Sequence, residues 1–140
     1  MATASANVLH QTTQEDSIVI RSEKNDMVLT ASSDSVFLER YNSSSSAQIW
    51  LVQSTLYGKI IVNVSNRKVL DVEGGAKTNN WITISRKGES TSQFWNINPD
   101  GTITNAGTNL ALDVNMCNKL KLYPKHGKAN QRFPIQLKNF

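Results

Sequence analysis

The triplet Gln93-Phe94-Trp95 has one counterpart before it, Gln48-Ile49-Trp50, and one after it, Gln131-Arg132-Phe133. Successive copies lie roughly 40 residues apart, and periods of about 20 to 50 residues are typical of proteins built from repeats. In such proteins each unit buries its apolar face only against its neighbours. The triplets therefore predict three similar units that together span the chain.

Two further segments recur upstream of each triplet, and both are short and apolar. The nearer segment reads Val36-Phe37-Leu38, Ile82-Thr83-Ile84 and Leu120-Lys121-Leu122. The farther segment reads Val28-Leu29-Thr30-Ala31, Val69-Leu70-Asp71-Val72 and Ala111-Leu112-Asp113-Val114, preceded at a fixed offset by Ser22, Asn63 and Asn105. Short apolar runs rich in Val, Ile and Thr are typical of strands. Four strands per unit give twelve in all.

The connections between the units have the chemistry of hairpin turns. They read Tyr57-Gly58-Lys59 and Pro99-Asp100-Gly101, and glycine adopts a positive φ while proline presets a turn. A chain of 140 residues, 39% of them hydrophobic, is long enough for one self-standing core. We expect one domain over residues 16–140, with repeats of about 16–56, 57–99 and 100–140. Residues 1–15 are small and polar and are expected to form a flexible N-terminal arm.

The composition argues against a secreted protein with a signal peptide, a membrane-inserted protein, a protein with an internal disulfide and a metal- or cofactor-binding protein. The first residues lack a basic and an apolar region, so no secretory signal is predicted and synthesis in the cytoplasm is expected, with release by a non-signal route left open. No apolar run approaches the roughly 18 residues of a membrane span, so no membrane insertion is expected. Cys117 is the only cysteine and cannot form an internal disulfide. No cluster of metal ligands or cofactor motif appears, so no metal and no cofactor are expected.

The net charge of +4 raises the question of a nucleic-acid partner. Nucleic-acid binding needs a dense basic face with stacking aromatic residues. The lysines are only weakly clustered, toward the last repeat, so no nucleic acid is expected. Binding of a polyanion by the last repeat stays open as a secondary possibility.

The triplets, together with Leu-Asp-Val some 20 residues upstream of two of them, resemble the ricin B-type (QxW) β-trefoil lectin family over roughly residues 16–140. The resemblance implies an all-β β-trefoil, in which a six-stranded barrel is capped by three hairpins. Large apolar side chains at equivalent points of three repeats are expected to meet in the core. These residues are Trp50, Trp95 and Phe133.

The resemblance also implies a sugar site made of an aspartate on the second strand, an aromatic residue closing the third strand and an asparagine beside the triplet glutamine. A carboxylate accepts strong bonds from hydroxyl groups, an amide donates and accepts, and an aromatic ring packs on the apolar face of a sugar. The third repeat has every part, and its expected carbohydrate-binding residues are Asp113, Tyr123, Asn130, Gln131, Lys121 and His126. Of these, Gln131 is expected to hold Asp113 in place rather than to carry the sugar alone.

The second repeat is incomplete. It keeps Asp71 and Gln93 but has Ser85 in the aromatic position and Ser92 in the asparagine position. Trp81 supplies an aromatic face from another direction, so Asp71, Trp81 and Gln93 form a possible weak second site. The polar loop of residues 74–80 is an alternative place for a pocket.

The first repeat departs furthest from the pattern. Thr30 stands in the aspartate position, Glu39 in the aromatic position and Ala47 in the asparagine position. No sugar site of this kind is expected there.

These observations predict a non-catalytic lectin whose partners are glycans of glycoproteins or glycolipids. The resembled family favours galactose or N-acetylgalactosamine. An enzyme is not expected, because Asp71 and Asp113 belong to different repeats and no opposed pair of carboxyl groups for glycoside hydrolysis is evident. Two alternatives remain open: a trefoil protease inhibitor that uses the loops of residues 43–46 or 74–80, and the receptor-binding component of a multi-chain toxin. A homodimer is a possible route to multivalent binding.

Overall fold

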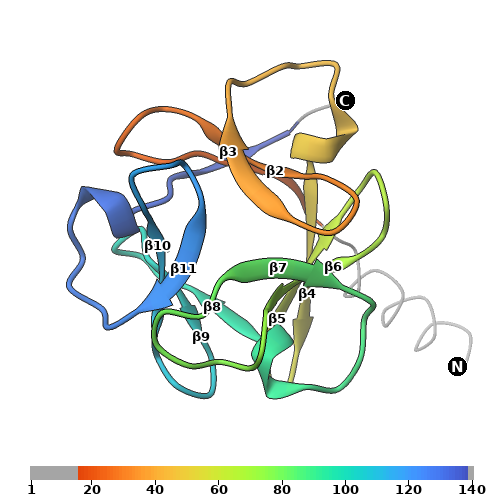
Figure 1. The fold of residues 1–140 in the computed structure, drawn as a ribbon. Coiled ribbons are helices and arrows are strands. Elements are labelled where there is room, and N and C mark those ends of the chain that lie inside the picture. Colours follow the sequence, from red (N-terminus) through yellow and green to blue (C-terminus); the bar gives the residue numbers. More distant parts are fainter. Residues whose placement is uncertain (1–15, 139–140) are drawn as a thin grey trace, which may run out of the picture.

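The computed structural model describes residues 16–138, and the predicted arm of residues 1–15 lies outside them. The described part holds twelve strands and three short 3-10 helices, four strands and one 3-10 helix in each repeat (Figure 1). The first repeat contains β1 (Asp16–Ile20), β2 (Val28–Ala31), β3 (Val36–Glu39), η1 (Ser46–Gln48) and β4 (Trp50–Thr55). The second contains β5 (Gly58–Asn63), β6 (Val69–Val72), β7 (Ile82–Ser85), η2 (Thr91–Gln93) and β8 (Trp95–Ile97). The third contains β9 (Ile103–Asn105), β10 (Ala111–Val114), β11 (Leu120–Tyr123), η3 (Ala129–Gln131) and β12 (Ile135–Leu137).

The first and last strands of each repeat form a barrel. They follow one another as β12, β1, β4, β5, β8 and β9 in an antiparallel path. The two ends of this path meet where the backbone N–H of Phe133 donates to the carbonyl of Gly101 at 2.7 Å. The predicted β-trefoil with twelve strands is therefore confirmed. Among residues 16–138 no helix is long and apolar enough to cross a membrane.

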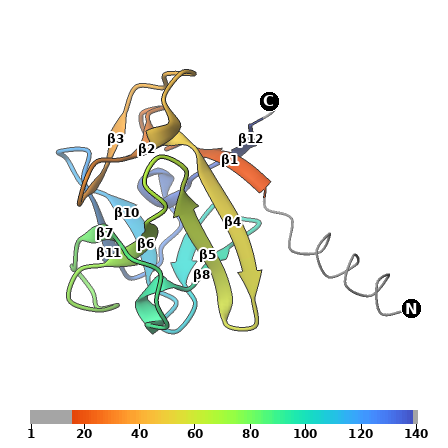
Figure 2. The same cartoon turned by 90° about the vertical axis from the view of Figure 1, so that its right-hand side faces the viewer.

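The middle strands of each repeat form three hairpins, β2–β3, β6–β7 and β10–β11. The hairpins surround a pseudo-threefold axis in Figure 1, and Figure 2 shows them on one side of the barrel. Isolated bridges join each hairpin to the next, at Ser35 with Thr83, at Phe37 with Lys119 and at Trp81 with Lys121. This end of the molecule is thus built from all three repeats.

The triplet aromatic residues lie in the core, as predicted. Trp50 and Trp95 are 0% exposed and Phe133 is 1% exposed. The two indole N–H groups donate to the carbonyls of Leu29 at 3.0 Å and Leu70 at 3.1 Å, so burial leaves neither without a partner. Phe133 fills the same place in the third repeat without a polar atom to satisfy.

The first residue of each triplet, a glutamine, is buried and fixes the loop that precedes it. Gln48 donates to the carbonyl of Arg40 and accepts from the backbone N–H of Asn42, both at 2.8 Å. Gln93 does the same with Arg86 and Gly88, at 2.9 and 2.8 Å. The glutamine therefore satisfies backbone groups that the irregular loop would otherwise leave unpaired.

The three residues six positions before β2, β6 and β10 close equivalent turns. Asn63 donates to the carbonyl of Ala47 at 2.9 Å, and Asn105 donates to the carbonyl of Thr91 at 3.0 Å. The hydroxyl of Ser22, at the third equivalent position, is the one buried polar side-chain atom without a partner among the described residues. A serine side chain is too short to span the distance that the asparagines cover.

Candidate functional site

Asp113 lies on β10 with its carboxylate held from two sides. Its side chain is buried, and its Oδ1 accepts a bond of 2.8 Å from Nδ2 of Asn130. Its Oδ2 accepts a bond of 2.8 Å from Nε2 of Gln131. A carboxylate offers about four acceptor positions, so this one keeps capacity for further donors. The strand and the two amides fix its orientation in advance.

Gln131 lies behind Asp113 and has no capacity left for a ligand. It is fully buried, and its second amide hydrogen goes to the carbonyl of Pro124 at 3.1 Å. Its oxygen accepts from the backbone N–H groups of His126 and Gly127, at 2.8 and 3.0 Å. Gln131 therefore holds the carboxylate of Asp113 in place.

The other five predicted residues come together around one surface hollow of about 500 Å³. Asp113 and Asn130 lie beside Lys121, Tyr123 and His126 in its wall. Residues that the sequence pattern does not indicate also line it, among them Lys24, Asn115 and Met116.

Three of these residues form a group at the end of β11. The ammonium of Lys121 stands 4.8 Å from the ring centroid of Tyr123, and the ring of His126 meets that of Tyr123 edge-on at 6.4 Å. Tyr123 is 38% exposed, so part of its ring is open to a ligand. Lys121 also donates to the side chain of Asn79 at 3.3 Å, which places the loop of residues 74–80 beside the hollow.

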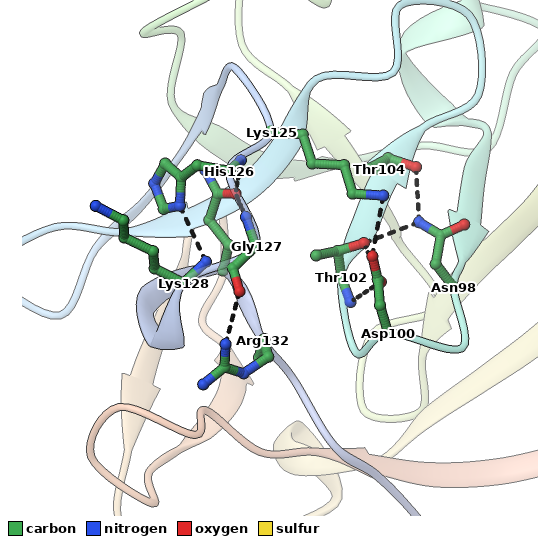
Figure 3. Close-up of polar contacts among 10 residues, drawn as sticks. Asn98, Asp100, Thr102, Thr104, Lys125, His126, Gly127, Lys128 and Arg132 are labelled. Carbon is green, nitrogen blue, oxygen red and sulfur yellow. Dashed lines mark hydrogen bonds and ion pairs between the residues drawn. The ribbon is translucent and has the colours of Figure 1, made fainter.

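The loop of residues 124–128 places His126 beside Asp113. Figure 3 shows His126 in this loop with its neighbours Lys125, Gly127 and Lys128. Nδ1 of His126 accepts from the backbone N–H of Lys128 at 3.0 Å, so the neutral ring carries its hydrogen on Nε2. That Nε2 lies 3.6 Å from Oδ2 of Asp113. Gly127 adopts a φ of +72°, which glycine tolerates at little cost, and this turns the loop back toward η3.

Arg132, the middle residue of the third triplet, ties together two walls of the hollow. Its guanidinium donates to the carbonyl of Gly127 at 2.6 Å (Figure 3) and makes a bidentate pair with Glu23 at 2.6 and 2.7 Å. Glu23 precedes Lys24, which lines the hollow. The hydrogen bonds from Arg132 hold the pKa of Glu23 below its usual range, and those to Glu23 raise the pKa of Arg132.

A second anchor of the same loop joins Lys125 to Asp100 in the β8–β9 turn. The ammonium lies 3.0 Å from the carboxylate (Figure 3). The Asp100 carboxylate also accepts from the hydroxyl and the backbone N–H of Thr102, at 2.6 and 2.9 Å. The bonds from Thr102, followed by Lys125, hold the pKa of Asp100 well below its usual range.

This depressed pKa predicts a pH-dependent contribution to stability. The carboxyl group of Asp100 has a pKa of about 4 in the unfolded chain and a lower pKa in the folded protein. The ionised carboxylate therefore stabilises the folded protein at neutral pH, and this stabilisation is lost as the pH falls below the pKa of the unfolded chain. We expect Asp100→Asn to lower the free energy of unfolding at pH 7, with a smaller difference from the wild type at pH 3. Urea unfolding of both proteins at the two pH values measures this difference in the free energy of unfolding.

Lys125→Met is the matched control for this prediction. It removes the ion pair but keeps both bonds from Thr102, which are the larger causes of the shift. Most of the pH dependence should therefore remain in this variant. If Asp100→Asn lowers the free energy of unfolding by the same amount at pH 7 and at pH 3, the lowered pKa of Asp100 does not contribute to stability.

The second repeat lacks the arrangement around Asp113. Oδ2 of Asp71 accepts from Gln93 at 3.1 Å, but its Oδ1 is taken by the backbone N–H of Val72 at 2.7 Å. Ser92, in the asparagine position, bonds to Ser90 instead. Trp81 lines a separate hollow between the hairpins, and Asp71 does not line that hollow. Asp71 and Gln93 of the possible weak second site therefore lie together, while Trp81 lines a different hollow.

The first repeat has no carboxylate at this point. The hydroxyl of Thr30 donates to the carbonyl of Val28 at 2.9 Å. Among residues 16–138 there is also no group of three side chains of the kinds that hold a metal ion.

Comparison with known proteins bears on the family and the fold of the chain. Residues 56–139, more than half of the chain, match the model of the ricin-type beta-trefoil lectin domain. No curated protein gives a significant match to the sequence.

Solved structures share the fold at low sequence identity. A ricin B-like lectin of Macrolepiota procera in complex with lactose is 17% identical, with a TM-score of 0.73 over 85% of this chain and 93% of the lectin. The designed threefold symmetric protein ThreeFoil is 18% identical, with a TM-score of 0.76 over 85% of this chain and 96% of the design. A non-toxic homologue of type II RIPs from Momordica charantia, in complex with α-methyl-D-galactoside, is 24% identical, with a TM-score of 0.72 over 88% of this chain and 48% of the homologue.

Proposed function

The chain belongs to the ricin-type β-trefoil lectin family, and from this premise we propose that it binds glycans ending in galactose or N-acetylgalactosamine through the third repeat. In this proposal Asp113 accepts hydrogen bonds from two neighbouring hydroxyls, and Asn130 bonds one of the same hydroxyls. Tyr123 packs against the apolar face of the sugar ring, while Lys121 and His126 contact the rim of the ligand.

One observation carries this proposal: a buried carboxylate, fixed by two amides, opens into a hollow beside a partly exposed aromatic ring. Charge-assisted bonds to a carboxylate are about twice as strong as neutral ones. A carboxylate fixed in advance loses little freedom when a ligand binds. The same hollow provides the polar groups and the apolar face that a pyranose needs.

The preference for galactose is supported by the ligands in two similar structures. One is a complex with lactose and the other a complex with α-methyl-D-galactoside. We propose the same sugar class here.

We further propose that the protein is not an enzyme. Asp71 and Asp113 belong to different hairpins, and each is held by a glutamine of its own repeat. Glycoside hydrolysis needs two carboxyl groups facing one bond, about 5 to 10 Å apart. The arrangement therefore suits binding.

The protease-inhibitor alternative gains no support from the loop of residues 74–80. The backbone of Asn79 donates to the carbonyl of Leu122 at 2.7 Å, and Leu122 donates to the carbonyl of Asn80 at 2.9 Å. The end of this loop is therefore attached to β11. No observation favours the receptor-binding component of a toxin over a lectin that acts alone.

Affinity chromatography and a glycan array test the proposal. We expect retention on immobilised galactose and elution by free galactose but not by an equal concentration of glucose. On the array, signals should fall on glycans with terminal galactose or N-acetylgalactosamine. Folded protein that binds no glycan would contradict the proposed function.

A single shallow site is expected to bind a monosaccharide weakly, because much of the sugar remains in water. Strong attachment to cells then requires several sites on one particle, and a homodimer would provide two. Light scattering at the concentration used for agglutination would decide between monomer and dimer.

A further inference from the structure

Trp81 has no role in the core or in the Asp113 hollow. It lies just before β7 and is 44% exposed, whereas the other two tryptophans are fully buried. The ammonium of Lys119 stands 5.8 Å from the centroid of its ring. An exposed indole offers a large rigid surface with a hydrogen-bond donor at its edge, and such residues are enriched at binding surfaces.

Trp81 lines a hollow of about 570 Å³ between the three hairpins, here called the hairpin hollow. Its lining comes from β3, from the start of β7 and from the β10–β11 turn, so all three repeats contribute. The hairpins that form it face the viewer in Figure 1. Glu39, Glu73 and Thr83 line the same hollow as Trp81.

These groups match the two faces of a pyranose ring. Carboxylates and hydroxyls accept hydrogen bonds from sugar hydroxyls, and the ammonium of Lys119 donates to them. The indole offers an apolar surface for the C–H side of the ring.

The hairpin hollow adjoins the Asp113 hollow across the β10–β11 turn. Cys117 lines both hollows. Asn115 and Met116 line only the Asp113 hollow, while Lys119 lines only the hairpin hollow. The backbone of Trp81 also forms a bridge with Lys121, which lines the Asp113 hollow. A ligand longer than one sugar ring is therefore able to contact both.

We propose that the hairpin hollow is a second subsite, which holds an inner sugar of an oligosaccharide whose terminal galactose-type sugar lies at Asp113. This inference rests on the proposed function and adds to it that the ligand is an oligosaccharide. Trp81 packs against the inner sugar, and Glu39, Glu73 and Lys119 bond its hydroxyls. The protein then distinguishes glycans that share a terminal sugar by the identity of the next sugar in the chain.

Trp81→Ala tests the subsite by calorimetry with methyl galactoside and with the galactose-terminated oligosaccharide that binds best on the array. We expect the affinity for the oligosaccharide to fall about tenfold, since losing one ring contact on an aromatic residue has effects of that order. The affinity for methyl galactoside should not change. Trp81→Phe keeps an aromatic ring and should restore part of the loss.

Tyr57→Ala is the matched control, because Tyr57 is also an exposed aromatic residue but lines a different hollow near the β4–β5 turn. It should change neither affinity. Equal affinities of Trp81→Ala and wild type for the oligosaccharide would overturn the inference, and so would an equal loss for both ligands. A wild type that binds neither ligand would instead refute the proposed function.

Acrylamide quenching of tryptophan fluorescence provides an independent readout. Trp81 is the accessible member of the three tryptophans, since Trp50 and Trp95 are buried. The oligosaccharide should protect the fluorescence from quenching, and methyl galactoside should not. Absence of protection by a bound oligosaccharide would overturn the assignment of Trp81.

Discussion

Replacing Asp113 with asparagine is expected to lower the affinity for galactose by about 100-fold or more, since two bonds to a charged acceptor are lost or weakened. The amide also places a donor against Asn130 or Gln131, which both donate to the carboxylate in the wild type. Calorimetry with galactose, or the loss of retention on immobilised galactose, measures the effect.

Asp71→Asn is the matched control for this prediction. It removes the same charge at the equivalent position of the second repeat and disturbs the same kind of bond, from Gln93. Circular dichroism should show both variants folded, with galactose binding retained only in Asp71→Asn. Unchanged binding by Asp113→Asn would disprove the assigned site, and equal losses in both variants would indicate a structural effect.

Trp50→Ala is expected to lower the free energy of unfolding by about 3 to 5 kcal/mol, the usual range for removal of a buried large aromatic side chain. Trp50 is fully buried, and its N–H bonds to the carbonyl of Leu29. The total stability of a domain is about 5 to 15 kcal/mol, so the variant should lose a large fraction of its stability. Urea unfolding followed by circular dichroism measures the difference.

Trp50→Phe separates the contribution of the indole hydrogen bond from that of the packing of the ring. The third repeat already uses Phe133 at the equivalent position, so this variant should retain most of the packing and lose less stability than Trp50→Ala. A loss of less than about 1 kcal/mol in Trp50→Ala would contradict the assignment of this residue to the core, because exposed substitutions usually lie within that range.

The fold was predictable because its signals are local and repeated. Short runs of β-branched and apolar residues indicate a strand, and glycine or proline at a fixed position indicates a hairpin turn. Three copies in register reinforced each other, and the structure has the twelve strands that they predict. The order of the strands in the barrel came from the resemblance to a known family and not from the pattern alone.

The candidate site was predictable only in part. The residues from the third repeat itself, such as Asp113 and Asn130, were indicated by the family resemblance, which assigns roles to positions at fixed offsets from the triplet. Lys24 was not, because it reaches the hollow from a turn in the first repeat. That turn is fixed by the bond of Asn25 to Asn118 at 2.9 Å and by the pair of Glu23 with Arg132. The repeat pattern of the sequence does not predict contacts between such distant residues.

The sequence by itself determined the threefold plan and the aromatic core, and with the family resemblance it indicated which repeat keeps the complete set of candidate site residues. The tertiary structure decided how the carboxylate is held, which distant loops form the walls of the hollow and where Trp81 lies. The physical reason is that strand formation and core burial depend on the local alternation of side chains. The shape of a surface hollow depends instead on hydrogen bonds and ion pairs between loops of different repeats, which only the folded chain brings together.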